Sequence, residues 1–263
     1  MEVRLDVTKS VQENAAAHYE AGKKLREKAK GAEKAITETK KKLAELEKKI
    51  SLEAAKPPPT VRVKREKQWF EKFKWFTTGG GKLVVAGSDA KQNEVAVARY
   101  LEAGDLFFHA EIHGAPATIL KGGQQAAQKE KEETAQFAAS HSSGWKTGAA
   151  SVDVYAVKPE QVSKRTESGE SVGKGGFIIR GEREWFRNTP LGLLVGVNAE
   201  GRIESAPISR GKAPLASAVE VTPGRLEKGE AARKIAAALK RADAVDDILQ
   251  AIPGGSSAVN RLL

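Results

Sequence analysis

Small or apolar residues recur every 3.5 positions through the first fifty residues of the chain. The repeating positions are Val11, Ala15, His18, Gly22, Leu25, Ala29, Ala32, Ile36, Thr39, Leu43, Leu46 and Ile50. Such a repeat, sustained over more than five heptads, predicts a long coiled-coil helix. Ser10 fits its N-cap, and Glu13 fits the capping-box partner three residues later.

The seam of this helix is uneven along its length. Its first half holds small or polar residues such as Ala15, His18 and Gly22, whereas Leu43 to Ile50 resembles a zipper. Small seam residues bury little surface, so the helix is expected to need a partner. The alternative is a helix packed against its own domain.

Three consecutive prolines, Pro57 to Pro59, interrupt the pattern. Proline lacks the amide hydrogen and clashes with the preceding helical turn, so the helix is expected to end before this run. A proline run also forms a stiff, extended spacer. We therefore expect three regions: a coiled-coil arm and spacer at 1–60, a globular domain at 61–215 and a C-terminal extension at 216–263.

The remainder of the chain mixes short strand patterns with helical ones. Strands are expected at 82–87, 105–112, 117–121, 151–157, 176–180, 191–197 and 219–221, and helices at 90–102, 124–141 and 228–239. The aromatic stretch at 69–76 fits a short amphipathic helix or a helix joined to extended chain. Without a strict βαβ alternation, the pattern predicts an α+β class, with a mixed β-sheet and flanking helices.

Charge narrows the range of partners. The formal net charge is +10 and the pI is about 9.6, which favours a polyanion such as RNA or DNA, although a general lysine bias also produces such a charge. The chain has no cysteine, which excludes disulfides and thiolate metal sites. No apolar run approaches membrane-spanning length and no signal-peptide core opens the chain, so a cytoplasmic protein without a membrane partner is expected.

His109, Glu111 and His113 alternate along a predicted strand, which would place them on one face. Two imidazoles and a carboxylate are a plausible ligand set for a metal-dependent enzyme acting on nucleic acid. Two other interpretations stay open: histidines that face RNA, by stacking on bases or donating to phosphate, and hydrogen-bonded structural histidines. The glycine-rich TTGGGK at 77–82 lacks Walker A spacing and reads as a turn.

Two further stretches combine bases with aromatic or glycine residues. His141 to Lys146 reads as a helix end followed by a loop, in which Trp145 and Lys146 suit nucleotide stacking and phosphate contact; a packed core tryptophan is the alternative. Residues 158–187 are rich in glycine and bases, a composition that suits contacts along a phosphate backbone. The candidate RNA-binding residues are Arg99, His109, His113, Lys121, Trp145, Lys146, Lys164, Lys174 and Arg180. No catalytic triad can be argued from the sequence, and no resident metal or cofactor is expected.

Several segments together resemble the NFACT family, which includes the NEMF, RqcH and Caliban ribosome quality-control factors. They are WFEKFKWF at 69–76, LVVAGSDAKQNEVAVARYL at 83–101, DLFFHAEIHGA at 105–115, SHSSGWKTG at 140–148 and QVSKRTESGESVGKGGFIIRGEREWF at 161–186. Their order and spacing resemble the NFACT-R RNA-binding domain. Residues 11–36 are similar to the start of the family's coiled coil, and the tail motifs at 221–224 and 252–259 look like archaeal versions.

The resemblance implies an RNA-binding module that acts on the large ribosomal subunit. Family members bind a subunit obstructed by peptidyl-tRNA, recruit charged tRNA and support untemplated C-terminal tailing of the stalled chain, while the coiled coil reaches toward proteins of the stalk base. Since the ribosome performs the peptide-bond chemistry, no enzyme activity is implied. The sequence lacks the family's N-terminal NFACT domain, so a fragment, a split gene with a separate partner chain, or a reduced member is expected.

Overall fold

The computed structural model describes residues 3–54, 68–165 and 172–262. The chain divides into two compact units, Met1–Arg65 and Glu66–Leu263. The three prolines and the expected boundary after residue 60 lie outside the described residues. Each unit is described below by itself.

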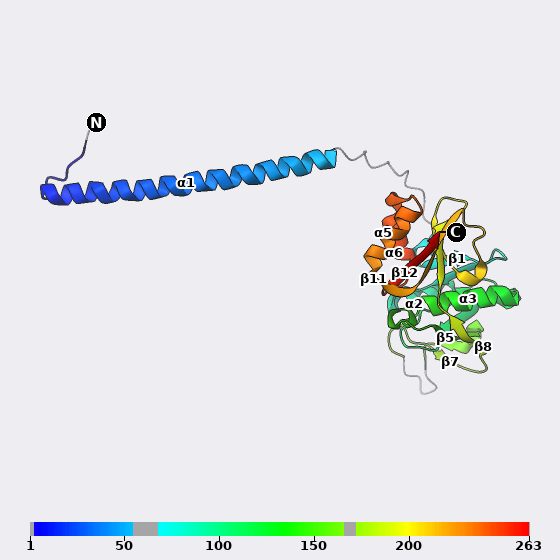
Figure 1. The fold of residues 1–263 in the computed structure, drawn as a ribbon. Helices are drawn as coiled ribbons and strands as arrows, with labels where there is room; N and C mark the ends of the chain where they lie inside the picture. Colours follow the sequence, from blue (N-terminus) through cyan, green and yellow to red (C-terminus); the bar gives the residue numbers. More distant parts are fainter. Residues whose placement is uncertain (1–2, 55–67, 166–171, 263) are drawn as a thin grey trace. The chain divides into compact units, whose positions relative to one another are not determined.

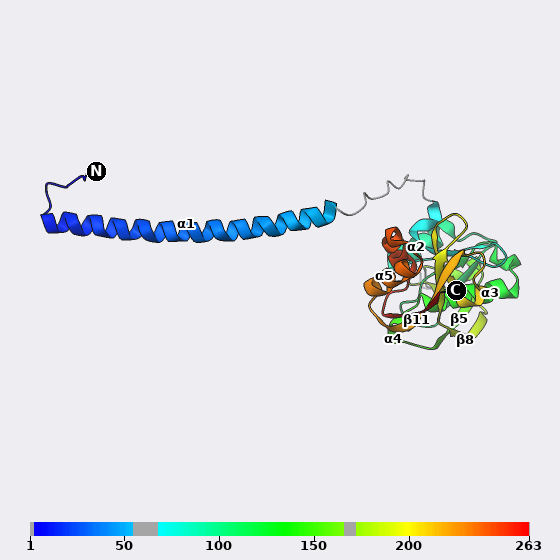
Figure 2. The ribbon, with the colours of Figure 1, turned by 45° about the horizontal axis from the view of Figure 1, so that its top comes forward.

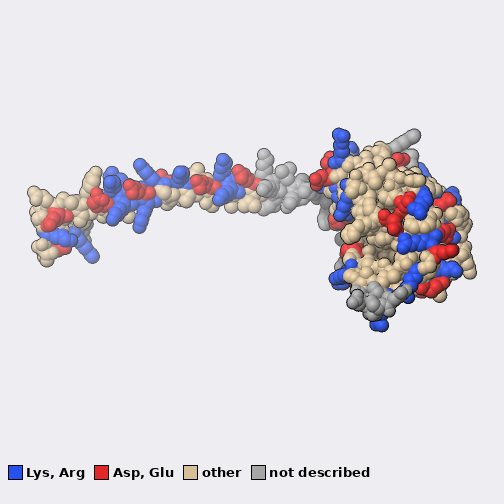
Figure 3. Space-filling model, turned by 90° about the horizontal axis from the view of Figure 1, so that it is seen from below, with Lys and Arg blue, Asp and Glu red and all other residues tan. Residues whose placement is uncertain are grey.

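The first unit consists of the helix α1 (Val11–Ala54) and the residues that precede it (Figure 1). The predicted capping box is confirmed: the Ser10 amide donates to Glu13 Oε2 at 2.8 Å, and the Glu13 amide donates to Ser10 Oγ at 3.3 Å. Residues before the cap fold back over the first turn, where the Asn14 side chain accepts from the Asp6 amide at 2.8 Å. Acidic and basic side chains alternate along the helix (Figure 3).

Four large apolar residues of the α1 seam are exposed. Leu25, Ile36, Leu43 and Leu46 show 55–66% of their surface to solvent. Their burial would supply most of the stability of such a helix, because propensity alone is weak. The helix is thus the predicted one, and these four apolar side chains are open to solvent.

Removal of residues 1–56 is expected to leave the free energy of unfolding of the globular unit within about 0.5 kcal/mol of the full chain. The reason is that the larger unit has its own continuous core. Chemical denaturation of the two proteins, followed by tryptophan fluorescence, measures this. A truncated protein that loses cooperative unfolding would show that the arm belongs to the core.

The larger unit contains a six-stranded sheet in the order β1-β2-β4-β3-β5-β8. Its strands are β1 (Lys74–Thr77), β2 (Leu83–Ala86), β3 (Leu106–Ala110), β4 (Thr118–Leu120), β5 (Ser151–Val157) and β8 (Glu184–Pro190). All its neighbouring pairs are antiparallel, so the sheet is antiparallel rather than mixed. The helix α2 (Ala90–Tyr100) joins β2 to β3, but β4 lies between these strands and keeps every neighbour antiparallel.

A second sheet of four strands has the order β10-β9-β11-β12. These strands are β9 (Leu193–Val197), β10 (Ile203–Pro207), β11 (Ser217–Leu226) and β12 (Ser257–Leu262). A short pair, β6 (Val162–Ser163) with β7 (Ile178–Ile179), lies beside the larger sheet. The segment 216–263, expected as an extension, contributes two strands to the second sheet, so it belongs to the same compact unit as 66–215.

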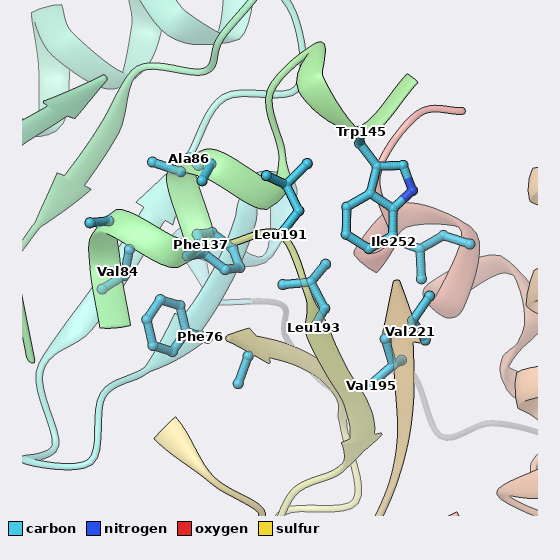
Figure 4. Packing of buried hydrophobic residues seen from close by; sticks show 14 of the residues in the cluster. Phe76, Val84, Ala86, Phe137, Trp145, Leu191, Leu193, Val195, Val221 and Ile252 are labelled. Atoms are coloured by element: carbon cyan, nitrogen blue, oxygen red, sulfur yellow. The ribbon is translucent and has the colours of Figure 1, made fainter. Parts of the chain in front are cut away.

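One hydrophobic core joins the two sheets. The helix α3 (Gln128–Ser140) packs against both of them, while α5 (Lys228–Ala238) and α6 (Val245–Ala251) cover the second sheet (Figures 1 and 2). The cluster contains Phe76 and Phe137 from the first side and Leu193, Val195 and Val221 from the second (Figure 4). The short helix α4 (Gly144–Thr147) contributes Trp145 to the same cluster. These observations confirm the α+β class.

A buried ion pair also links the sheets. Glu204 on β10 and Arg210, in the turn after it, lie 2.5 Å apart, with side chains 2% and 0% exposed. Glu204 Oε1 accepts from the Thr77 amide at 3.2 Å, and Arg210 Nη1 donates to the Thr77 carbonyl at 2.9 Å. The pair therefore provides hydrogen-bond partners for the backbone amide and carbonyl of Thr77, at the end of β1.

Candidate nucleic-acid interface

A cavity of about 750 Å³ opens on the larger unit. Its walls come from the start of α2, the end of β3, the turn at 112–116, the segment 141–146 and the glycine-rich loop at 172–177. Four of the predicted RNA-binding residues line it: His109, His113, Lys146 and Lys174. These residues span 66 positions of the sequence and are brought together only by the fold.

The predicted alternation along β3 holds up to Ala110. Leu106, Phe108 and Ala110 pack into the main core, whereas Phe107 lies in the cluster on the opposite side of the sheet. His109 shares that side: its ring stacks against Phe107, with centroids 6.2 Å apart, and lies 5.9 Å from the Tyr155 ring. Burial lowers the pKa of His109, so at neutral pH its ring is uncharged and suited to stacking or hydrogen bonding.

The strand ends before Glu111, which corrects the expected one-face arrangement of His109, Glu111 and His113. The chain turns there, with the Ile112 amide donating to the Ala110 carbonyl at 2.8 Å. Glu111 Oε2 instead accepts from Arg183 Nη1 at 3.3 Å, and His113 is exposed. Over the described ranges, no group of three or more histidines, aspartates or glutamates is arranged to hold a metal ion.

The start of α2 and the glycine-rich loop form the opposite wall. Asp89 caps α2, accepting from the Gln92 amide at 2.8 Å. Glu94 on this helix accepts from the Gly175 amide at 3.1 Å and pairs with Lys164 at 2.7 Å. Gly175 has a φ of +79° and lies so close to Ala90 that a Cβ atom would be 2.6 Å from it, which requires glycine. Lys174 is exposed at the rim.

Basic residues form the floor of the cavity, and sequence reasoning missed two of them. Lys74 is 8% exposed, and its Nζ donates to the Ile252 carbonyl at 2.9 Å. Burial, with a contribution from Lys228, lowers the pKa of Lys74 to about 7. Burial also holds the pKa of His141 well below its usual value, and both its ring nitrogens are buried without a hydrogen-bond partner in the described part of the chain.

Phe107, Tyr155 and Phe177 form an aromatic wall of the cavity. Beside this wall, arginine and aromatic side chains form a strip along β5 and β8. The Tyr155 and Trp185 rings lie 5.5 Å apart, and the Arg183 guanidinium lies 4.5 Å from the Tyr155 centroid. The Arg187 guanidinium stacks on Trp185 at 3.7 Å and pairs with Asp153 at 2.7 Å. We call Tyr155, Arg183, Trp185 and Arg187 the arginine–aromatic strip. Stacked guanidinium and aromatic planes are the groups on which unpaired bases stack.

The other predicted residues do not line the cavity. Lys121 pairs with Asp105 at 2.6 Å and Glu102 at 3.0 Å, while Arg99 and Arg180 are exposed on the last turn of α2 and after β7. Lys164 is tied to Glu94 and lies 5.1 Å from the Phe177 ring. The interspersed acids and bases on one face of this unit are visible in Figure 3.

Trp145 and the TTGGGK turn have structural surroundings. Trp145 is 1% exposed and donates from Nε1 to Ser257 Oγ at 3.2 Å, which leaves no ring face for a base, so the core alternative describes it better. In the turn, the Gly79 amide donates to Glu133 Oε2 at 2.8 Å. Because α3 places a carboxylate there, this turn is not a phosphate loop.

Comparisons with known proteins agree on one domain type. Residues 72–181 match the NFACT protein RNA binding domain. The chain is 42% identical over 220 residues to the archaeal Rqc2 homolog aRqcH of Methanocaldococcus jannaschii, covering 82% of this chain and 32% of that protein. It is 30% identical over 203 residues to the human ribosome quality control complex subunit NEMF, covering 75% of this chain and 18% of that protein. The chain therefore spans about a third or less of the length of these relatives.

Among solved structures, the chain is similar to the C-terminal part of the fibronectin/fibrinogen-binding protein from Streptococcus suis. The TM-score is 0.39 at 21% identity, over 69% of this chain and 77% of that one. Among the helices that the structure describes, none has the length and apolar character needed to cross a membrane.

Proposed function

This chain belongs to the NFACT family, of the archaeal type, and from that premise we propose that its larger unit binds RNA as a module of a ribosome-associated quality-control factor. The proposal rests on one observation: predicted RNA-binding residues within the matched domain lie around the same cavity. The segment matched to the NFACT RNA binding domain, 72–181, contains His109, His113, Lys146 and Lys174, which the fold gathers around one cavity.

The chemistry of this face supports RNA rather than duplex DNA. The strip offers arginine and aromatic planes, and the cavity beside it is concave, with an aromatic wall and a basic floor. Duplex DNA keeps its bases stacked inside, whereas loops and ends of RNA present bases that can stack on such planes. Lys174 and His113 would contact the phosphates at the rim, because both are exposed.

Affinity for RNA should fall steeply with salt. If about five phosphates are contacted, the slope of log K against log salt is expected to be roughly −3 to −5, since each neutralised phosphate releases a counterion. Fluorescence anisotropy with a labelled archaeal tRNA and with a fragment of large-subunit ribosomal RNA measures this slope. Affinity that stays flat between low and moderate salt would contradict the electrostatic basis of the proposal.

Changing both His109 and His113 to alanine should weaken RNA binding. A lost base or phosphate contact costs about 1–3 kcal/mol, or roughly 5- to 150-fold in affinity. His113 is exposed, so His113→Ala alone should leave the melting temperature unchanged, whereas His109→Ala removes partly buried surface. Affinity is therefore compared per folded molecule. A lower melting temperature with intact RNA affinity in both variants would make these histidines structural.

The finer assignments extend the same proposal. We expect the unit to contact large-subunit ribosomal RNA and tRNA on an obstructed subunit, in the cytoplasm, and to support tailing as a binding module rather than as an enzyme. The exposed seam of α1 suits docking to proteins at the stalk base. Co-sedimentation with isolated large subunits, with and without peptidyl-tRNA, tests this: equal binding to both would oppose selectivity for obstructed subunits.

A further inference from the structure

Four basic side chains lie at the floor of the cavity or next to it, each from a different element of the larger unit. Lys74 comes from β1, His141 from the end of α3, Lys146 from α4 and Lys228 from the start of α5. Lys74, His141 and Lys146 line the cavity itself. They are separated by up to 72 positions in the sequence and belong to no common motif.

These groups act on one another as like charges. Lys228 contributes to the lowered pKa of Lys74, and both lysines contribute to the lowered pKa of His141. Lys146 in turn contributes to the lowered pKa of Lys228, after burial. Burying several bases together is unfavourable unless they are neutral or an anion compensates them. An anionic ligand would therefore offset the free-energy cost of burying these basic side chains together.

The polar atoms of the floor have unused hydrogen-bonding capacity. The Lys74 ammonium has three donors, and the Gln250 and Ile252 carbonyls accept two of them, at 3.3 and 2.9 Å. The His141 ring nitrogens have no hydrogen-bond partner among the residues described. His141 lines the cavity, so a hydrogen-bond partner for its ring can come from there.

Lys146 is the third side chain of the cluster that lines the cavity. It is exposed, and its side chain lies over Gly254 and Gly255, where added Cβ atoms would be 3.2 Å from Cε and 2.9 Å from Cγ, respectively. The two glycines thus let the stem of Lys146 lie close to the backbone beside the cavity.

We propose that the floor formed by Lys74, His141 and Lys146 binds one phosphate group of an RNA strand. The proposal deepens the RNA-binding function and rests on it for the source of the phosphate. A phosphate supplies oxygen acceptors for the free Lys74 donor, the His141 ring and the Lys146 ammonium, and its charge compensates theirs. The neighbouring aromatic wall, with Phe107, Tyr155 and Phe177, leaves room for the attached nucleoside.

Binding of AMP and of inorganic phosphate tests the site in the full chain. The protein has four histidines, so the ring resonances of His141 can be assigned by NMR with a His141→Gln variant. At pH 7.5, AMP is expected to shift these resonances saturably, and inorganic phosphate to do so more weakly. If neither ligand moves them at matched ionic strength, the site does not exist.

Proton uptake provides a second readout. The free protein holds Lys74 at a pKa of about 7 and His141 well below its usual value, and a bound dianion raises both. Above pH 7 the phosphate of AMP is already dianionic, so protons taken up on binding belong to the protein. Affinity should therefore rise as pH falls from about 8.5 toward 7. Calorimetry in two buffers of different ionisation enthalpy that shows no uptake would overturn the proposal.

Variants connect the ligand to the named residues. Lys146→Gln, at an exposed position, and Lys74→Met, which keeps the volume, are each expected to weaken AMP binding about tenfold or more. Lys129→Gln removes the same charge from an exposed position on α3 and should change nothing. If Lys146→Gln and a folded Lys74→Met both bind AMP like the parent chain, the floor is not the site.

RNA competition separates this inference from the proposed function. A short single-stranded RNA should displace AMP and produce the same His141 shift. RNA that binds without displacing AMP leaves the proposed function standing and overturns the phosphate site as an RNA site. If the chain binds AMP but no RNA, then RNA is not the source of the phosphate, and the proposed function is wrong as well.

Discussion

Glu204→Ala is expected to destabilise the larger unit by about 3–5 kcal/mol, because it leaves Arg210 charged and buried without its partner. The same change removes the acceptor of the Thr77 amide at the end of β1. For a unit of this size the melting temperature should fall by roughly 6–20 °C. Urea unfolding followed by tryptophan fluorescence measures the free-energy change.

Two further proteins distinguish the ion pair from a general sensitivity to mutation. Glu182→Ala removes an exposed carboxylate and should cost less than about 0.5 kcal/mol. The double change Glu204→Leu with Arg210→Met should recover a large part of the loss, since apolar residues of similar volume replace many buried pairs at little cost. A Glu204→Ala protein as stable as Glu182→Ala would mean that water or neighbouring groups compensate Arg210.

Local signals predicted much of the fold correctly. The capping box of Ser10 and Glu13 depends on residues only three positions apart, and it is present. The alternation that places Phe108 and Ala110 in the core also depends only on neighbours along one strand. Such patterns are readable because the backbone geometry that they satisfy is local.

The pairing of strands that are far apart in the sequence could not be predicted from local patterns. β9 pairs with β11, and β11 with β12, whose residues are more than thirty positions further along, so nothing near 215 indicates that the chain continues the same sheet. The boundary expected at 215 therefore does not separate two compact units. The expected one-face arrangement of His109, Glu111 and His113 failed for another reason: the chain turns after Ala110, and alternation alone does not reveal where a strand ends.

The candidate site also has one part that local sequence patterns could predict and one part that they could not. Its floor joins Lys74 to His141, which no local pattern connects. The arginine–aromatic strip, in contrast, had a usable signal: Arg183, Trp185 and Arg187 are spaced by two, so a strand displays all three on one face. Sequence reasoning noted the two arginines only as part of a basic loop and gave Trp185 no role of its own.

That strip yields the largest expected effect on binding. The double variant Trp185→Ala with Arg187→Ala should weaken single-stranded RNA binding by roughly 30-fold or more, since base–aromatic stacking contributes about 1–3 kcal/mol per base and the arginine adds a phosphate or stacking contact. Arg187 stacks on Trp185 at 3.7 Å, so the two changes should not be additive. Anisotropy titrations of both single variants and of the double variant measure the coupling.

The matched control is Arg225→Ala, which removes the same charge from an exposed position on β11 in the second sheet. If the strip binds bases, Arg225→Ala lowers affinity only through net charge, by less than about threefold, while Trp185→Ala, which changes no charge, lowers it more. The salt slope separates the two terms further: Arg187→Ala should make it shallower by up to about one unit, and Trp185→Ala should leave it unchanged. Equal losses for Arg187→Ala and Arg225→Ala, with Trp185→Ala silent, would mean that RNA is held by diffuse charge and that the strip only stabilises the edge of the sheet.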